Sequence, residues 1–340
     1  MCTFYWSQCG KINVYAKRRG TQEWTDKMAD LFCVKLGETM RGTFAEHVKQ
    51  YAYGEALLVL PNRFLLQSEQ QKGTVRAVNM DYLPNEILRA NRRDRFEMLS
   101  RRSQEIIVKK LIDDKKKAGQ LKYLLNIADA DSFAKIVTGF IGELSRAGTT
   151  AEEFAEAVSA WERKNGYGLK DEEIASIYTD YRKVLKKNNW YDIDGLYRLA
   201  TIELQKAGSI IPWQALFFSD FYQFDHLQLD LIAAIKDRCT VSIGIVGDMK
   251  NDELYGATLN TIGDLLGCGF KLHKVSDLTD RNEELQHFCL HWKNDIVVFD
   301  KEVENIKVFE AASIENEMRT VLEDIKRKLS NGTSCEEILL

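Results

Sequence analysis

The chain has 340 residues, a formal net charge of -4, and 45% hydrophobic against 29% charged residues. This composition excludes a disordered chain and a uniformly basic nucleic-acid coat, and the length exceeds what a single hydrophobic core usually spans. No run approaches the roughly 18 apolar residues of a membrane helix, and the N-terminus lacks the features of a secretory signal. We therefore expect a cytoplasmic protein of more than one domain, with no membrane partner.

The first quarter of the chain predicts strands that alternate with helices. Residues 11–16 form a short apolar run, and residues 24–36 show helical spacing after a polar stretch. This order predicts a strand, a loop and a helix. Residues 56–60, which precede a proline, predict a second strand, and residues 74–78 predict a third before a turn around residues 81–84. Such alternation is typical of a parallel sheet.

The middle of the chain predicts a helical insertion. Residues 91–208 form long amphipathic segments that Gly and Asn residues interrupt. Strand patterns return at residues 215–218 and 240–246, and we expect them to complete the sheet. The prediction is an α/β domain of residues 1–90 and 209–300 that encloses an all-helical domain.

The C-terminal segment predicts the beginning of a further domain. Residues 306–309 are rich in β-formers, residues 315–329 show helical spacing, and the chain ends in an apolar run at residues 337–340. A native C-terminus is usually frayed and polar. We therefore expect residues 301–340 to begin a second α/β domain of a longer protein.

Two small clusters of polar residues could hold a metal or act as paired acids. His287 and His291 are four residues apart, but no cysteine or acid with suitable spacing joins them, so an ordinary helix is favoured and no metal site is predicted. No C-x-x-C pair occurs among the seven cysteines. Asp192 and Asp194 precede a helical segment, and a helix cap explains them better than a pair of catalytic carboxylates.

Residues 246–257 (VGDMKNDELYGA) resemble motif III of UvrD-like superfamily 1 helicases. Gly247 and Asp248 match the pattern, and Asn251 stands where those helicases have glutamine. Residues 57–63 resemble the start of motif Ia, which touches single-stranded DNA in that family. The resemblance implies a P-loop NTPase (RecA-like) fold for the α/β domain.

Residues 219–228 follow an apolar strand and resemble motif II. Asp220, Gln223 and Gln228 match, whereas Phe221 replaces a glutamate. In the family the aspartate helps to hold magnesium and the glutamate positions the attacking water, a role that phosphoryl transfer to water requires. A phenylalanine cannot orient water.

Within this superfamily the chain is most similar to AddB/RexB-type helicase-nuclease subunits. Phe221, Phe224 and Gln228 fit the pattern of those subunits, and so does the stretch of residues 138–150. The resemblance implies a role in processing double-strand DNA ends for recombinational repair, and an active helicase-nuclease partner subunit. It also implies a nuclease domain that lies beyond this chain.

A phosphate cradle needs several glycines, a lysine and a Ser or Thr at the start of a helix. We expect it between the first predicted strand and helix, where residues 16–24 offer only Gly20 and Thr21 and lack the Gly-Lys-Ser/Thr sequence. The basic residues there are explained by a solvated loop. The chain thus lacks two features that ATP hydrolysis requires, the phosphate cradle and the glutamate that Phe221 replaces. We therefore expect no catalytic residues in this chain and no bound ATP or magnesium.

The candidate DNA-binding residues come from two parts of the chain. Residues 91–119 hold ten Lys or Arg against five acids, a local excess that favours contact with the DNA backbone. An aromatic residue beside a basic one can also stack on a base. The candidates are Asn62, Arg63, Phe64, Arg92, Arg93, Arg101 and Arg102.

The sequence favours an inactivated helicase-like region that binds DNA and acts as a scaffold. Two alternatives stay open. One is an active superfamily 1 ATPase with unusual motifs, which would use Asp220 and Asp248. The other is a protein-interaction module that does not bind DNA, which would be favoured if the basic helices of residues 91–119 face another domain.

Overall fold

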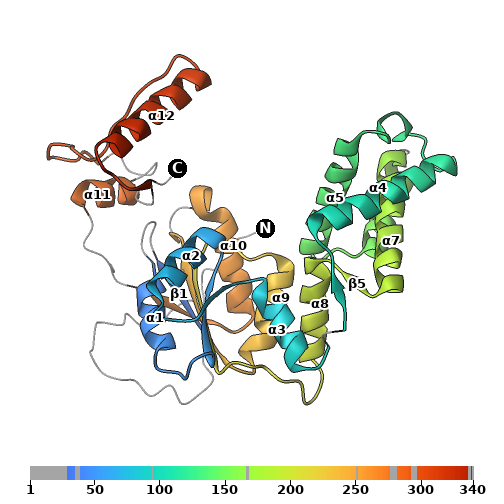
Figure 1. Ribbon diagram of the computed structural model, residues 1–340, viewed down its shortest axis with the longest axis horizontal. Coiled ribbons are helices and arrows are strands. Elements are labelled where there is room, and N and C mark those ends of the chain that lie inside the picture. The colour runs from blue at the N-terminus through green and yellow to red at the C-terminus, as the bar shows by residue number, and fades with distance from the viewer. Residues whose placement is uncertain are drawn as a thin grey trace. The chain divides into compact units, whose positions relative to one another are not determined.

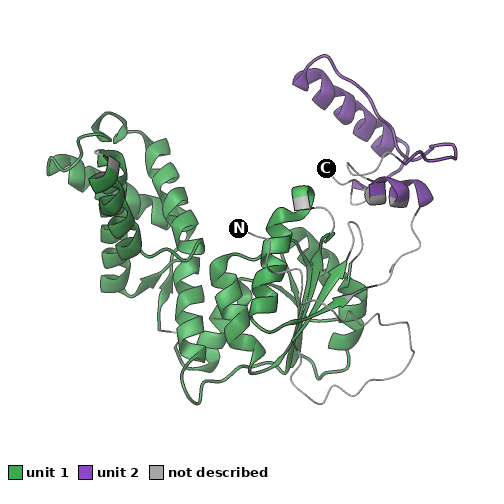
Figure 2. Cartoon of the chain, turned by 180° about the vertical axis from the view of Figure 1, so that it is seen from behind, with its two compact units in different colours: residues 1–278 green, residues 279–340 purple. Residues whose placement is uncertain are grey.

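The computed structural model describes residues 29–34, 39–93, 95–165, 168–249, 252–275, 282–291, 297–335 and 338. The chain divides into two compact units, residues 1–278 and 279–340 (Figure 2). Among the described residues, no helix combines the length and the apolar character needed to cross a membrane.

A six-stranded sheet forms the centre of the first unit (Figure 1), with the strand order β3-β2-β6-β7-β1-β8. Neighbouring strands are parallel throughout. The strands are β1 (Ala29–Val34), β2 (Ala56–Leu60), β3 (Ala77–Asn79), β6 (Ala215–Phe221), β7 (Thr240–Val246) and β8 (Lys271–Lys274). The prediction of an α/β fold with a parallel sheet is confirmed, and strands from both sides of the insertion complete the sheet.

Two hydrophobic clusters cover the two faces of this sheet. Side chains alternate along a strand, so Leu57 and Val59 of β2 lie in one cluster, and Leu58 and Leu60 lie in the other. All five residues of β2 are buried, as expected for a central strand of a doubly covered sheet. The sheet helices are α1 (Arg41–Val48), α2 (Arg63–Lys72), α3 (Tyr82–Ala90), α9 (His226–Lys236) and α10 (Asp252–Gly267).

The helix predicted over residues 24–36 is wrong, because residues Ala29–Val34 form strand β1. This strand lies between β7 and β8 in the sheet. Its short apolar run has the same local pattern as a buried helical turn, and periodicity does not separate the two. The strand predicted over residues 11–16 lies outside the described residues, and the turn predicted at residues 81–84 is the start of α3.

The insertion has a hydrophobic core of its own, formed by residues between Leu99 and Leu185. Its helices are α4 (Arg101–Lys117), α5 (Asp131–Arg146), α6 (Ala151–Asn165) and α7 (Leu169–Asn188), with one 3-10 turn, η1 (Leu125–Ile127). It is not entirely helical, because β4 (Glu97–Met98) pairs with β5 (Trp190–Tyr191). Two strands of two residues carry no periodic signal that a sequence pattern could detect.

Helix α8 (Ile193–Leu204) falls within the range predicted for the insertion but packs in the core of the sheet. Leu196, Tyr197 and Ala200 are buried there. The side chain of Asp192 caps this helix by accepting from the backbone N–H of Gly195 at 2.7 Å, which confirms the predicted helix cap.

The second unit contains α11 (Glu283–His291) and α12 (Ile314–Ser330). The helix predicted over residues 315–329 is confirmed. Ser313 caps its start, and Gly332 follows its end with φ at +91°. Residues 306–309 form no strand, contrary to the prediction. A single strand needs a partner to satisfy its backbone groups, and the described residues of this unit contain no other strand.

Candidate functional site

The candidate site lies at the carboxyl edge of the sheet, between β2 and β6. These strands are neighbours, but the chain leaves β2 toward β3 on one side and leaves β6 toward β7 on the other. In open α/β sheets, ligands bind outside the carboxyl ends of the strands, where the connections diverge in this way.

A cavity of about 430 Å³ opens at this point. It brings together the ends of β2, β3 and β6, which are far apart in sequence. Its lining consists of Pro61, Asn62, Arg63, Asn79, Met80, Asp81, Phe221, Gln223 and Gln228. Two groups of residues singled out from separate motifs therefore share one cavity.

The basic side of this cavity, residues Asn62 and Arg63, is the N-terminus of α2. Asn62 caps the helix, since its Oδ1 accepts from the backbone N–H of Leu65 at 2.9 Å. Arg63 is exposed, and the exposed fraction of Phe64 is 55%. A helix N-terminus with an arginine favours a negatively charged group.

Gln228 is held in place by the N-terminus of α9. It forms a capping box with Asp225: the Asp225 Oδ1 accepts from the Gln228 N–H at 2.9 Å, and the Gln228 Oε1 accepts from the Asp225 N–H at 3.1 Å. Burial raises the pKa of Asp225. Asp81 supplies the carboxylate of the cavity and accepts from the Tyr197 hydroxyl at 2.9 Å.

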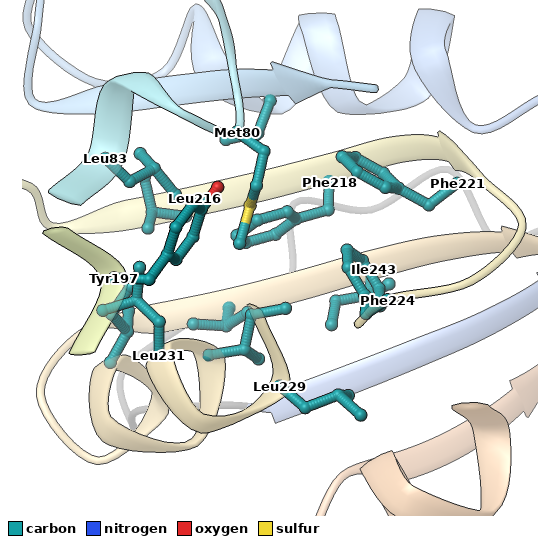
Figure 3. Close-up of a cluster of buried hydrophobic side chains, with 14 of the residues drawn as sticks. Met80, Leu83, Tyr197, Leu216, Phe218, Phe221, Phe224, Leu229, Leu231 and Ile243 are labelled. Atoms are coloured by element: carbon teal, nitrogen blue, oxygen red, sulfur yellow. The ribbon is translucent and has the colours of Figure 1, made fainter. Parts of the chain in front are cut away.

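Phe221 ends strand β6 with its side chain in the core. Its exposed fraction is 4%, and its ring stacks on Phe224 with centroids 4.6 Å apart. Figure 3 shows it among the buried residues of the cluster. The position where the helicase motif has a glutamate is thus an apolar packing position.

Asp220, one residue earlier, has an unusual backbone and a charged partner. Its φ is +63°, in the left-handed region, beside an irregularity in the pairing with β7. The Arg41 Nε lies 3.6 Å from its Oδ2 and 3.5 Å from Oε1 of the buried Glu69. The Ser219 hydroxyl also donates to Asp220, at 3.1 Å.

Sequence reasoning missed Arg41 and Glu69 because it misplaced β1. Arg41 begins α1, the helix that follows β1 in the chain. The signal that could have found it is an apolar run at residues 31–34 followed by Gly37 and then by Arg41. Gly20 and Thr21 lie outside the described residues.

The motif III-like segment is described only in part. Gly247 follows β7, and its N–H donates to the Val34 carbonyl at 2.8 Å, which joins the carboxyl ends of β7 and β1. A Cβ atom at Gly247 would meet the Thr258 side chain at 3.0 Å. Asp248 follows directly, and Asn251 lies outside the described residues.

The structure does not bring the four candidate arginines of residues 91–119 (Arg92, Arg93, Arg101 and Arg102) to the cavity. Arg92 is exposed, with φ at +54°. Arg93 lies 3.3 Å from Glu203. Arg101 and Arg102 both lie near Glu105 on α4. The Arg101 Nε is 3.8 Å from the Glu105 Oε1, and the Arg102 Nη1 is 3.4 Å from the Glu105 Oε2. Three of these four charges therefore have an acid within ion-pair distance.

A family model described as "ADDB, N-terminal" matches residues 45–267, more than half of the chain. The matched range spans β2 to β7 and the whole insertion. No curated protein matches the chain.

Proposed function

The chain belongs to the AddB N-terminal family, and from this membership we propose a role in the processing of double-strand DNA ends for recombination and repair. The protein would act as a subunit of a helicase-nuclease, with an ATP-driven partner subunit.

The activity proposed for this region is binding of single-stranded DNA at the carboxyl edge of the sheet. The observation that carries it is the shared cavity, in which Asn62 and Arg63 face the same space as Gln223 and Gln228. Arg63 and the α2 N-terminus suit a phosphate, amide side chains suit base edges, and the exposed Phe64 suits stacking.

We also propose that this region does not hydrolyse ATP. Two observations support the loss. Arg41 stands at the start of α1 and lies against the Asp220 carboxylate that would hold magnesium, and the side chain at position 221 is buried among aromatic rings. Both features disfavour a magnesium nucleotide, so the competing proposal of an active ATPase has less support.

We propose that the α/β domain has a P-loop NTPase (RecA-like) fold. The strand order supports the assignment, since β1 and β6, which would carry the cradle and the acid, are separated by the single strand β7. In this scheme residues 1–90 and 209–300 form the helicase-like domain, residues 91–208 form the insertion, and residues 301–340 begin a second domain.

A second candidate, a protein-interaction module, is favoured by apolar side chains on the insertion. Ile106 of α4 and Ile136 of α5 are exposed by 58% and 67%. Exposed apolar side chains of this kind can contribute to a surface that another protein covers.

Fluorescence anisotropy with a labelled single-stranded oligonucleotide tests the DNA-binding proposal. Arg63→Glu should weaken binding by about tenfold, because it replaces a phosphate contact with a repulsive charge. Arg163→Glu, the same change at an exposed arginine of α6 outside the cavity, should weaken binding by about twofold or less. No binding of the unaltered chain at low salt would leave the interaction module as the better proposal.

A further inference from the structure

A second cavity, of about 370 Å³, lies in the insertion and shares no lining residue with the cavity at the sheet edge. The start of α6, the end of α7, strand β5 and helix α8 form its walls. Because four elements contribute, its shape is fixed by the packing of α6, α7 and β5 against α8.

Positively charged side chains dominate the polar lining. Arg182 and Lys186 lie one turn apart on α7, and Arg198 comes from α8. Two carboxylates oppose these three cations, those of Glu152 and Asp192. The charge that remains is positive.

The Asp192 carboxylate already has hydrogen-bond and ion-pair partners within the protein. It accepts from the Gly195 N–H at 2.7 Å and from the Tyr181 hydroxyl at 3.0 Å, and Arg182 lies 3.3 Å away. Arg198 donates to the backbone carbonyl of Ser145 at 3.0 Å and helps to lower the pKa of the exposed Glu153, but none of the described carboxylates lies within ion-pair distance of it. Lys186 is exposed, and no carboxylate among the described residues lies within ion-pair distance of it. Lys186 and Arg198 are therefore available to an anion.

The apolar part of the lining is aromatic. Trp190 is half-buried, and its indole N–H donates to the Glu97 carboxylate at 2.9 Å, which fixes the plane of the ring. Tyr191 packs edge-on against Phe96, with ring centroids 5.7 Å apart. A fixed aromatic ring beside two cations matches a ligand with a planar ring that can stack and with an anionic group.

We propose that this cavity binds one nucleotide of single-stranded DNA, with the base against Trp190 and the phosphate at Lys186 and Arg198. The inference rests on the proposed function for the identity of the ligand, but it uses a separate set of residues. Base stacking on an aromatic side chain and phosphate pairing with a cation are the two interactions by which proteins hold single strands without reading sequence.

Photochemical cross-linking of the whole chain to an oligonucleotide that carries 5-iodouracil tests the proposal without altering the protein. Mass spectrometry should find cross-links at Trp190 or Tyr191. Cross-links confined to Phe64 and its neighbours would overturn this inference but would still support the proposed site at the sheet edge. Cross-links confined to Trp190 or Tyr191 would support this inference and contradict the proposed site at the sheet edge. Failure of the chain to bind the oligonucleotide would overturn both.

Affinity measurements on variants give an independent check. Trp190→Leu and Lys186→Glu should each weaken binding by at least about fivefold. Lys187→Glu is the matched control, because it makes the same charge change at the next residue of α7 outside the cavity, and it should weaken binding by about twofold or less. Equal losses for Lys186→Glu and Lys187→Glu would mean that only the general charge of α7 matters, and would contradict the proposed cavity.

Discussion

The guanidinium of Arg41 lies against the carboxylate of Asp220, with Nε and Oδ2 3.6 Å apart. One residue begins the helix after β1, and the other lies at the end of β6. The same guanidinium reaches Glu69 on α2, which is 2% exposed. A side chain of the protein thus supplies the positive charge at the carboxyl edge of the sheet, between two acids.

Replacing Arg41 by methionine should destabilise the fold. Arg41→Met keeps much of the side-chain volume but leaves Glu69 with Lys72 as its remaining cationic partner, so we expect the free energy of unfolding to fall by about 1–3 kcal/mol. Urea denaturation measures it. Arg63→Met is the matched control, since Arg63 also begins a helix after a strand but is exposed. Equal effects of the two changes would contradict the role of Arg41.

Restoring a glutamate at position 221 should not restore a motor. Phe221→Glu places a carboxylate among aromatic side chains, and we expect a loss of about 3 kcal/mol or more in the free energy of unfolding, with no gain of ATP hydrolysis. Phe221→Leu, which keeps the position apolar, should cost about 1–2 kcal/mol. A folded Phe221→Glu variant with magnesium-dependent phosphate release would show that the site is only one residue from activity.

Two substitutions distinguish the contribution of the left-handed backbone at Asp220 to stability from that of its charge. Asn tolerates positive φ well and Ala does not. Asp220→Asn should therefore lose only the interaction with Arg41, whereas Asp220→Ala should be less stable than Asp220→Asn by about 1 kcal/mol. Thermal unfolding of the two variants in parallel tests this, and identical midpoints would contradict the backbone contribution.

Asp194 should make the fold less stable as the pH rises. Burial and the nearby Asp192 carboxylate raise the pKa of Asp194 from 3.8 to about 7. The folded state then holds a proton that the unfolded state releases above pH 3.8, so stability falls between about pH 4 and pH 7 and is constant above that.

Asp194→Asn removes this titration and keeps the shape of the side chain. At pH 8 it should raise the free energy of unfolding by about 1–3 kcal/mol, and the difference should shrink toward pH 4. Urea unfolding across this pH range measures it. A difference between the two proteins that is independent of pH would contradict the raised pKa.

Much of the sheet followed from the sequence. The strands at residues 56–60 and 240–246 are apolar runs bounded by breakers, and such runs identify buried strands well. The sequence also predicted the helix after Ser313 and the helix cap at Asp192, because a helix cap depends on a few neighbouring residues. These features depend on few residues close together in the chain.

The sequence predicted the candidate site only in part. Two separate motifs predicted functional roles for Asn62 and Arg63 and for Gln223 and Gln228. These residues line one cavity because β2 pairs with β6, and no local sequence pattern encodes that pairing. Arg41 was missed because the strand before it has the local pattern of a buried helix. The cavity around Trp190 was missed because its four walls come from four separate elements.

The most direct test of the account is the affinity of the whole chain for a labelled single-stranded oligonucleotide across a salt series, with and without ATP and magnesium. Binding that weakens steeply with salt and that is the same in both conditions is the predicted result. Binding that needs ATP and magnesium would contradict the loss of the motor, and the absence of binding at low salt would contradict the DNA-holding role itself.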